Sequence, residues 1–301
     1  MAGKQVTELD DLPSFTDTSL LPVHNGAGLK KGQLSQLASY LGTKFSNPNL
    51  LINPDFKINQ RGQTTYTKDN QGPAIYTVDR WSLWNGTLDA NSMLLKAHNS
   101  GNGLLMQIFE NKINGIATVS FEVSSVSGTL IALASNTSGD SLGEISVTKK
   151  GIYQFTVNGE ISDITFKISA GGSVTLAWTK LEQGSIATPF VAPNPTEELN
   201  KCLRFSRYIP IVYCVPSRQY IGHISSKGAY FLPLGCVFET KLRAKGTIKV
   251  KGGIYDSTSS PLGGVKEIDY STDELKTVTL PQEVTVWTLI VKQIFIDAEI
   301  Y

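Results

Sequence analysis

Tryptophan and tyrosine have the clearest capacity for ligand binding in this chain. Their rings can stack on the C–H faces of sugars while polar neighbours hydrogen-bond the hydroxyl groups. The run DRWSLWNGT at 79–87 places Trp81 and Trp84 three residues apart, and two such rings in a strand point to opposite faces. We therefore expect Trp81 to be buried and Trp84 to be the more exposed ring. Trp178 and Trp287 alternate with apolar neighbours, so we expect both in the core.

A second group with chemical potential lies in the last third of the chain. Residues 201–252 hold ten basic side chains and one acid, whereas residues 253–301 hold eight acids and three lysines. Two interpretations remain open. Basic and acidic strands could pair across one sheet, or the basic half could form a surface for an anionic ligand such as a phosphorylated or acidic polysaccharide. The candidate glycan-binding residues are Trp84, Tyr213, Arg218, Tyr220, Tyr230, Lys241, Lys245 and Lys249. The alternative for the aromatic ones is that their rings only pack within the protein.

Patterns that indicate catalysis or metal binding are missing from the sequence. His24, His98 and His223 are isolated, with no H-E-x-x-H spacing, and no G-x-S-x-G motif occurs. The stretch GAGLKKG at 26–32 lacks the phosphate-loop pattern G-x-x-x-x-G-K-[ST]. The acidic pair at 197–198 fits the first turn of a helix, where it complements the helix dipole. We predict no enzymatic activity, no catalytic residues, no cofactor and no metal site.

Composition argues against several further classes of protein. The 301 residues carry 27 Lys plus Arg against 26 Asp plus Glu, a net charge of +1, which argues against a partner of nucleic acid. Three cysteines without C-x-x-C spacing predict buried small side chains, not disulfides or a zinc site. No apolar run approaches the ~20 residues that cross a membrane, and the N-terminus has no signal-peptide pattern. We expect that the protein does not insert into a membrane and that it is synthesised in a cytoplasm.

Most of the chain has the pattern of short antiparallel strands. From about 49 to 192 apolar and polar residues alternate, most strictly at 117–123. Turn signals such as SGD at 138–140 and NGE at 158–160 separate the segments. Regularly spaced strands of this kind predict a β-sandwich or jelly roll, with polar outer faces that contact solvent.

An amphipathic helix is predicted before these strands. In GQLSQLASYLGTKF the apolar residues Leu34, Leu37, Leu41 and Phe45 fall on one helical face. A helix this short is marginal by itself in water, so its stripe must pack on another copy of the chain or on the following domain. These four residues are the candidates for oligomerisation or attachment.

A second, shorter helix marks a boundary near residue 194. Asn194 is suited to the N-cap and Pro195 to the first helical position. Leu199, Cys202, Leu203 and Ser206 would then lie on one side of this helix. Beyond it, apolar runs continue as strands, including the last residues, which we expect to lie within a sheet.

These patterns predict an all-β fold: a jelly-roll or β-sandwich domain followed by a second small β-sandwich, with a short extended N-terminal segment and helix. The predicted parts are an attachment segment at 1–46, the first sandwich at 47–193 and a C-terminal β tip at 194–301.

Two stretches carry a resemblance to a known family. NLLINPDFKINQRGQTTYT at 49–67 with YTVDRWSLW at 76–84, and LAWTKLEQGSIATPFVAPNPTEELNKCLRFSRY at 176–208, resemble the carbohydrate-binding-module-like domain of bacteriophage tail-fibre and related virion proteins. The N-terminal segment at 6–41 resembles the part by which such fibres attach to the particle. FETKLRAKGTIKV at 238–250 resembles their tip more loosely.

The resemblance implies a virion location and a homotrimer that attaches to other virion proteins through residues 1–46. It implies that the β-domains bind host-surface polysaccharide or lipopolysaccharide, although it supplies no residue set for the sugar. Two alternatives remain: a head fibre or structural connector that binds no receptor, and, with less support, an enzyme that depolymerises polysaccharide.

Overall fold

The computed structural model describes residues 19–24, 29–42, 45–216, 223–224, 230–237, 247–250, 267–270, 274–280, 288–297 and 299. Within these ranges strands dominate, which confirms the predicted all-β class. The helices are α1 (Leu34–Gly42) and α2 (Pro195–Cys202), and a hairpin of β1 (Leu20–His24) and β2 (Leu29–Gln33) precedes α1. The first large sheet contains β3 (Thr65–Lys68), β4 (Ile75–Tyr76), β5 (Ser82–Trp84), β6 (Gly86–Asp89), β7 (Leu94–Ala97), β8 (Gly103–Ser127), β9 (Leu130–Ser135), β10 (Ser141–Val147), β11 (Gly151–Ile168) and β12 (Ser173–Gln183).

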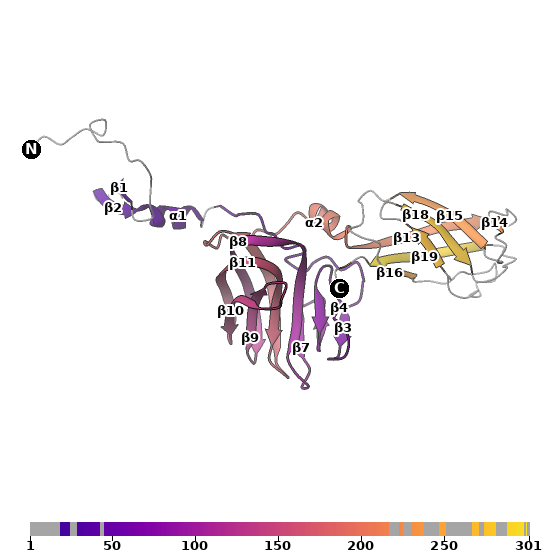
Figure 1. The fold of residues 1–301 in the computed structure, drawn as a ribbon, viewed down its shortest axis with the longest axis horizontal. Coiled ribbons are helices and arrows are strands. Elements are labelled where there is room, and N and C mark those ends of the chain that lie inside the picture. Colours follow the sequence, from indigo (N-terminus) through magenta and orange to yellow (C-terminus); the bar gives the residue numbers. More distant parts are fainter. Residues whose placement is uncertain are drawn as a thin grey trace, which may run out of the picture.

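This sheet forms a sandwich because its two longest strands each run through both layers (Figure 1). In the first layer the order is β10, β9, the second half of β11, the first half of β8, β5 and β4. In the second layer it is the first half of β11, the second half of β8, β12, β7, β6 and β3. All pairs are antiparallel, so the predicted jelly-roll or sandwich architecture is confirmed.

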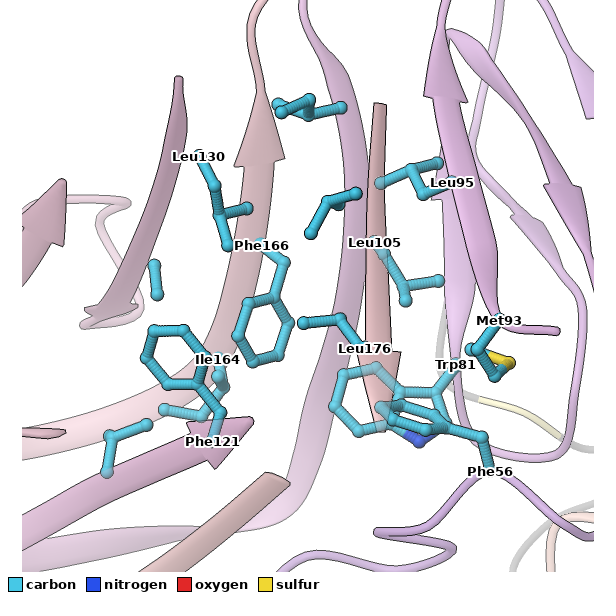
Figure 2. Close-up of a cluster of buried hydrophobic side chains, with 14 of the residues drawn as sticks. Phe56, Trp81, Met93, Leu95, Leu105, Phe121, Leu130, Ile164, Phe166 and Leu176 are labelled. Carbon is cyan, nitrogen blue, oxygen red and sulfur yellow. The ribbon is translucent and has the colours of Figure 1, made fainter. Parts of the chain in front are cut away.

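The hydrophobic core lies between the two layers. Phe121 of the second layer meets Phe166 of the first edge to face, with ring centroids 5.2 Å apart. Trp81 lies beside Phe56, with ring centroids 5.0 Å apart (Figure 2). The indole N–H of Trp81 donates to the Asn53 carbonyl at 2.9 Å. Trp81 is fully buried, as predicted from its spacing.

The strands change layer at a corner built from an irregular stretch and a glycine pair. Between the pairs Ile108–Asp163 and Ile113–Ile161, β8 has the four residues 109–112, whereas β11 has only Ser162. Just beyond, Gly115 (φ 97°) pairs with Gly159 (φ 148°), and a Cβ on Gly159 would lie 3.1 Å from the Leu142 side chain. The predicted turn at 158–160 is therefore wrong: the glycine allows bending and close approach within a continuous strand.

The outer face of the second layer also departs from the prediction. Thr118 and Ser120 were expected to contact solvent, but they are 1% and 3% exposed. The segment after β12 covers Thr118, since the Thr118 hydroxyl donates to the carbonyl of Gly184 at 2.7 Å. Ser120 lies opposite Lys180, which is itself buried. Period-2 alternation identifies the two faces of a strand but does not reveal which segment packs on the polar one.

Trp178 does not lie in the core as predicted. The register of β12 shifts between Thr175 and Trp178. Before the shift the even-numbered residues, such as Leu176, face the core, and after it the odd-numbered residues, such as Leu181, do. Trp178 therefore lies on the outer face. There its ring stacks on Phe190 with centroids 4.6 Å apart, and its N–H donates to Glu122 at 2.6 Å. A bulge of one residue reverses the face assignment, and the alternation of residue types does not show it.

The helix α2 begins as predicted and buries Cys202 as expected, but Glu198 takes the buried position expected for Leu199. Asn194 is the N-cap and accepts from the backbone N–H groups of Thr196 and Glu197. Leu199 is 37% exposed, whereas Glu198 and Cys202 are buried. Glu198 is inside because its carboxylate accepts the backbone N–H of Asn53 at 2.6 Å.

The C-terminal part contains two further antiparallel sheets, on the opposite side of the sandwich from α1 (Figure 1). One has the order β13-β19-β16 and the other β14-β15-β18-β17. The predicted C-terminal strand is confirmed as far as Asp297, because β19 pairs with β13 and β16, whereas Glu299 lies beyond the end of the strand. The bounds are β13 (Ser206–Pro216), β14 (His223–Ile224), β15 (Tyr230–Val237), β16 (Thr247–Val250), β17 (Glu267–Tyr270), β18 (Glu274–Leu280) and β19 (Thr288–Asp297).

The helix α1 and the hairpin β1–β2 lie apart from the sandwich (Figure 1). The predicted apolar stripe is largely uncovered within the chain: Leu37, Leu41 and Phe45 are 41%, 42% and 67% exposed. Leu34 is half-buried, and its backbone N–H donates to Ser19.

Candidate functional site

Trp84 lies on the outer face of the first layer. Its neighbour Leu83 is fully buried in the core, so alternation places the Trp84 ring on the other side of β5, where it is half-buried. Its indole N–H has no hydrogen-bond partner among the described residues. The prediction that Trp84 is freer than Trp81 is confirmed.

The sheet register aligns a row of half-buried side chains with Trp84. Trp84 pairs with Leu104, Leu104 with Lys167, and Lys167 with Ile131. Directly paired residues share a face, so all four point outward. Two strand spacings of about 4.8 Å place Lys167 about 10 Å from Trp84. We call these four residues, with Met106 and Thr165 in the adjacent row, the Trp84 face.

A loop held by internal hydrogen bonds adjoins the Trp84 face. Asn85 is fully buried and fixes the adjoining loop: its side-chain amide donates to the carbonyl of Asn102 at 3.1 Å and accepts from the Ser100 hydroxyl at 3.0 Å. Farther along β11, Asp163 accepts from the Thr165 hydroxyl at 3.0 Å. The face therefore combines an aromatic ring, an apolar floor and one ammonium group, with the carboxylate of Asp163 farther along the same strand.

A buried ionic network joins the sandwich to the C-terminal strands. Arg80 is 1% exposed, and its guanidinium contacts the carboxylate of Glu299, which also accepts the Arg80 backbone N–H at 3.0 Å. The guanidinium lies over the Phe205 ring, 3.8 Å from its centroid, and donates to the Ile108 carbonyl. The Arg80 Nε has no hydrogen-bond partner among the described residues. Because the guanidinium and the carboxylate are enclosed and neutralise each other, their geometry indicates structural attachment and not acid–base chemistry.

A second arginine extends the network. Arg61 lies 3.2 Å from Asp297, 3.6 Å from Glu299 and 3.6 Å from Asp79. Burial lowers the pKa of Arg61, but the three carboxylates outweigh it and the net shift is upward. Burial raises the pKa of Asp79 to about 6, against the opposing effects of Arg61 and of hydrogen bonds from Gln60. Burial likewise raises the pKa of the adjacent Cys202 thiol.

A separate buried pair anchors the chain segments that enter and leave the sandwich. Lys180 and Glu182 are 1% and 0% exposed, with the Lys180 Nζ 3.3 Å from the Glu182 carboxylate. The same ammonium donates to Thr188 at 2.6 Å and to the Ser46 hydroxyl at 3.0 Å. These bonds hold both segments on the outer face of the second layer, so that face is not available at β12.

Of the residues predicted to bind glycan, the structure describes the side chain of Trp84. Arg218, Tyr220, Lys241 and Lys245 lie outside the described residues, as does Trp287. The side chains of Tyr213, Tyr230 and Lys249 also lie outside them, although their backbones belong to β13, β15 and β16. The interpretation that strands of the basic half pair with strands of the acidic half is confirmed, because β13 and β16 pair with β19 and β15 pairs with β18. In these registers no Lys or Arg lies opposite an Asp or Glu: Arg207 is opposite Ile296 and Lys249 is opposite Phe295.

Sequence reasoning missed Lys167, Glu299 and the arginines at 61 and 80. The charged residues within the strongly apolar segments DRWSLW and IFIDAEIY were the available signal, since charges buried among apolar residues require partners.

Within the described ranges, no group of three or more His, Cys, Asp or Glu residues could hold a metal ion. None of the described helices is long and apolar enough to cross a membrane.

Comparison with known proteins gives limited similarities. No family model matches the chain, and no curated protein matches it. Among solved structures, a single-residue variant of CBM29-2, a family 29 carbohydrate-binding module, is 16% identical with a TM-score of 0.32, covering 46% of this chain and 95% of the module. Tailspike protein 4 of bacteriophage CBA120 is 14% identical with a TM-score of 0.28, covering 44% of this chain and 21% of the tailspike fragment. An exo-β-agarase is 12% identical with a TM-score of 0.30, covering 71% of this chain and 37% of the enzyme. At these scores the fold assignment rests on register and burial, and the comparisons place the chain in no family.

Proposed function

We propose that this protein is a non-catalytic glycan-binding protein whose first sandwich binds polysaccharide on the Trp84 face. The observation that supports this is the half-buried Trp84 ring, whose N–H has no partner among the described residues, in register with Leu104 and Lys167. An aromatic platform with an ammonium group in the same row suits a sugar, which presents apolar C–H faces and hydroxyl edges. The other described outer-face tryptophan, Trp178, is covered by Phe190 and is already hydrogen-bonded.

Replacing Trp84 by alanine is expected to weaken polysaccharide binding about tenfold or more, because it removes both ring stacking and apolar contact area. Affinity electrophoresis of the full chain through gels containing purified bacterial capsular polysaccharides or lipopolysaccharides measures the effect. The matched control is Trp178→Phe, which keeps the ring stack on Phe190 and lies away from the Trp84 face. Equal retardation of the wild type and W84A by every polysaccharide would reject this site.

The finer form of the proposal is a bacteriophage tail fibre that is attached to the virion by its N-terminal segment. Its support is the resemblance of the stretches at 49–84 and 176–208, together with an N-terminal helix that lies apart from the sandwich (Figure 1). Antibody labelling of purified particles tests the virion location. A structural connector is the second candidate, favoured by the buried Arg80–Glu299 junction between sandwich and C-terminal strands.

The fibre proposal includes a homotrimer assembled through α1. The exposed apolar side chains of Leu37, Leu41 and Phe45 would be buried between copies, since they are uncovered within one chain. Light scattering of the full chain is expected to give about three times 32.7 kDa. The double change L37S/L41S should give 32.7 kDa, whereas S35A on the same helix should leave the trimer intact. A monomeric wild type would exclude this assembly.

A further inference from the structure

The Trp84 face carries one ammonium group without a counter-charge among the described residues. Lys167 is half-buried, and its paired neighbours on both sides, Leu104 and Ile131, are apolar. Among the described side chains, no carboxylate lies within ion-pair distance of its Nζ. This differs from Lys180, Lys112 and Lys201, each of which has an acidic partner.

The acidic groups that share this outer face are placed elsewhere or already engaged. Asp163 is four residues along β11 from Lys167, a distance of about 13 Å in an extended strand, and it accepts from the hydroxyls of Ser162 and Thr165. Glu144 of β10 pairs with Leu133 in the adjacent row. A charged group that is partly removed from water and lacks a partner is stabilised when a ligand supplies the opposite charge.

Resting on the proposed function, we propose that the Trp84 face selects sugars that carry a carboxylate, with the carboxylate on Lys167 and a neighbouring sugar ring on Trp84. The separation of about 10 Å across two strand spacings requires a ligand that extends over more than one contact point, as an oligosaccharide does. Among the described residues of the face, Lys167 is the single cationic side chain. A ligand group with one negative charge, such as a carboxylate, matches it. Phosphate recognition by proteins more often uses arginine forks or clusters.

The test uses the full chain and two matched polymers: polygalacturonate and its methyl ester, which has the same backbone with the charge removed. A second pair, alginate and its methyl ester, repeats the comparison on a different sugar backbone, in case the polygalacturonate backbone does not fit the face. Isothermal titration at fixed ionic strength compares the wild type with K167Q, W84A and K150Q. Lys150 is exposed in the turn before β11, so K150Q makes the same change in net charge away from the site.

The wild type is expected to bind an acidic polymer about tenfold more tightly than its ester, in keeping with a charge-assisted contact. K167Q should bind acid and ester equally, K150Q should keep the preference, and W84A should weaken binding to both forms. Equal losses in K167Q and K150Q would overturn the inference, because they would indicate non-specific attraction. A wild type that binds the esters as well as the acids would overturn it too, while leaving the proposed function intact. Failure of the proposed function itself would be distinct, as W84A would then bind every polysaccharide as the wild type does.

Discussion

Replacing Glu299 by alanine is expected to lower the free energy of unfolding by about 3–5 kcal/mol, the usual cost of removing one partner of a buried ion pair. The change would leave the Arg80 guanidinium, 1% exposed, without its carboxylate, and would also remove the acceptor of the Arg80 backbone N–H. Urea denaturation followed by tryptophan fluorescence measures the effect, since the buried Trp81 directly follows Arg80 in the chain.

The matched control is Glu160→Ala, which breaks a pair with Lys112 in which both side chains are about half exposed. Exposed pairs contribute under about 1 kcal/mol, so E160A should unfold close to the wild type. The double variant R80M/E299L should regain part of the stability lost in E299A, because it leaves no charge buried alone. Similar small effects of E299A and E160A would show that the junction is not enclosed as described.

The second large effect is on pH dependence. Burial raises the pKa of Asp79 from 3.8 to about 6, so the folded chain binds this proton more tightly than the unfolded chain. Its contribution to stability is therefore complete below about pH 4 and is lost as the pH rises through 6. Between pH 7.5 and pH 5 we expect this group to increase the free energy of unfolding by about 1 kcal/mol.

Asp79→Asn isolates this contribution, because asparagine does not titrate. Whatever its absolute stability, D79N should lose the gain between pH 7.5 and pH 5 that the wild type shows in the same denaturation experiment. The two Gln60 donors and Arg61 that contact Asp79 remain in both proteins. An unchanged pH profile in D79N would assign the dependence to other groups.

Local patterns in the sequence correctly predicted much of the first sandwich. Alternation at 117–123 placed Val119, Phe121 and Val123 in the core, and the spacing of Trp81 and Trp84 separated a buried ring from a freer one. Asn194 was found as an N-cap from its position before Pro195. These features depend on the geometry of a single strand or turn, which adjacent residues determine.

Predictions failed where register or distant contacts decide the outcome. A bulge in β12 moved Trp178 to the outer face, and a corner pair of glycines made a strand of the expected turn at 158–160. Both depend on which residues lie opposite in the neighbouring strand.

The sequence by itself determined the all-β class, the amphipathic stripe of α1 and the two faces of most strands, because side-chain periodicity encodes them directly. The tertiary structure alone decided that Lys167 lies in a row with Trp84, through the order of three strands. It alone decided that Glu299 neutralises Arg80, a contact between residues separated by 219 positions. Such contacts depend on how the layers fold over one another, and no local spacing of residue types records that arrangement.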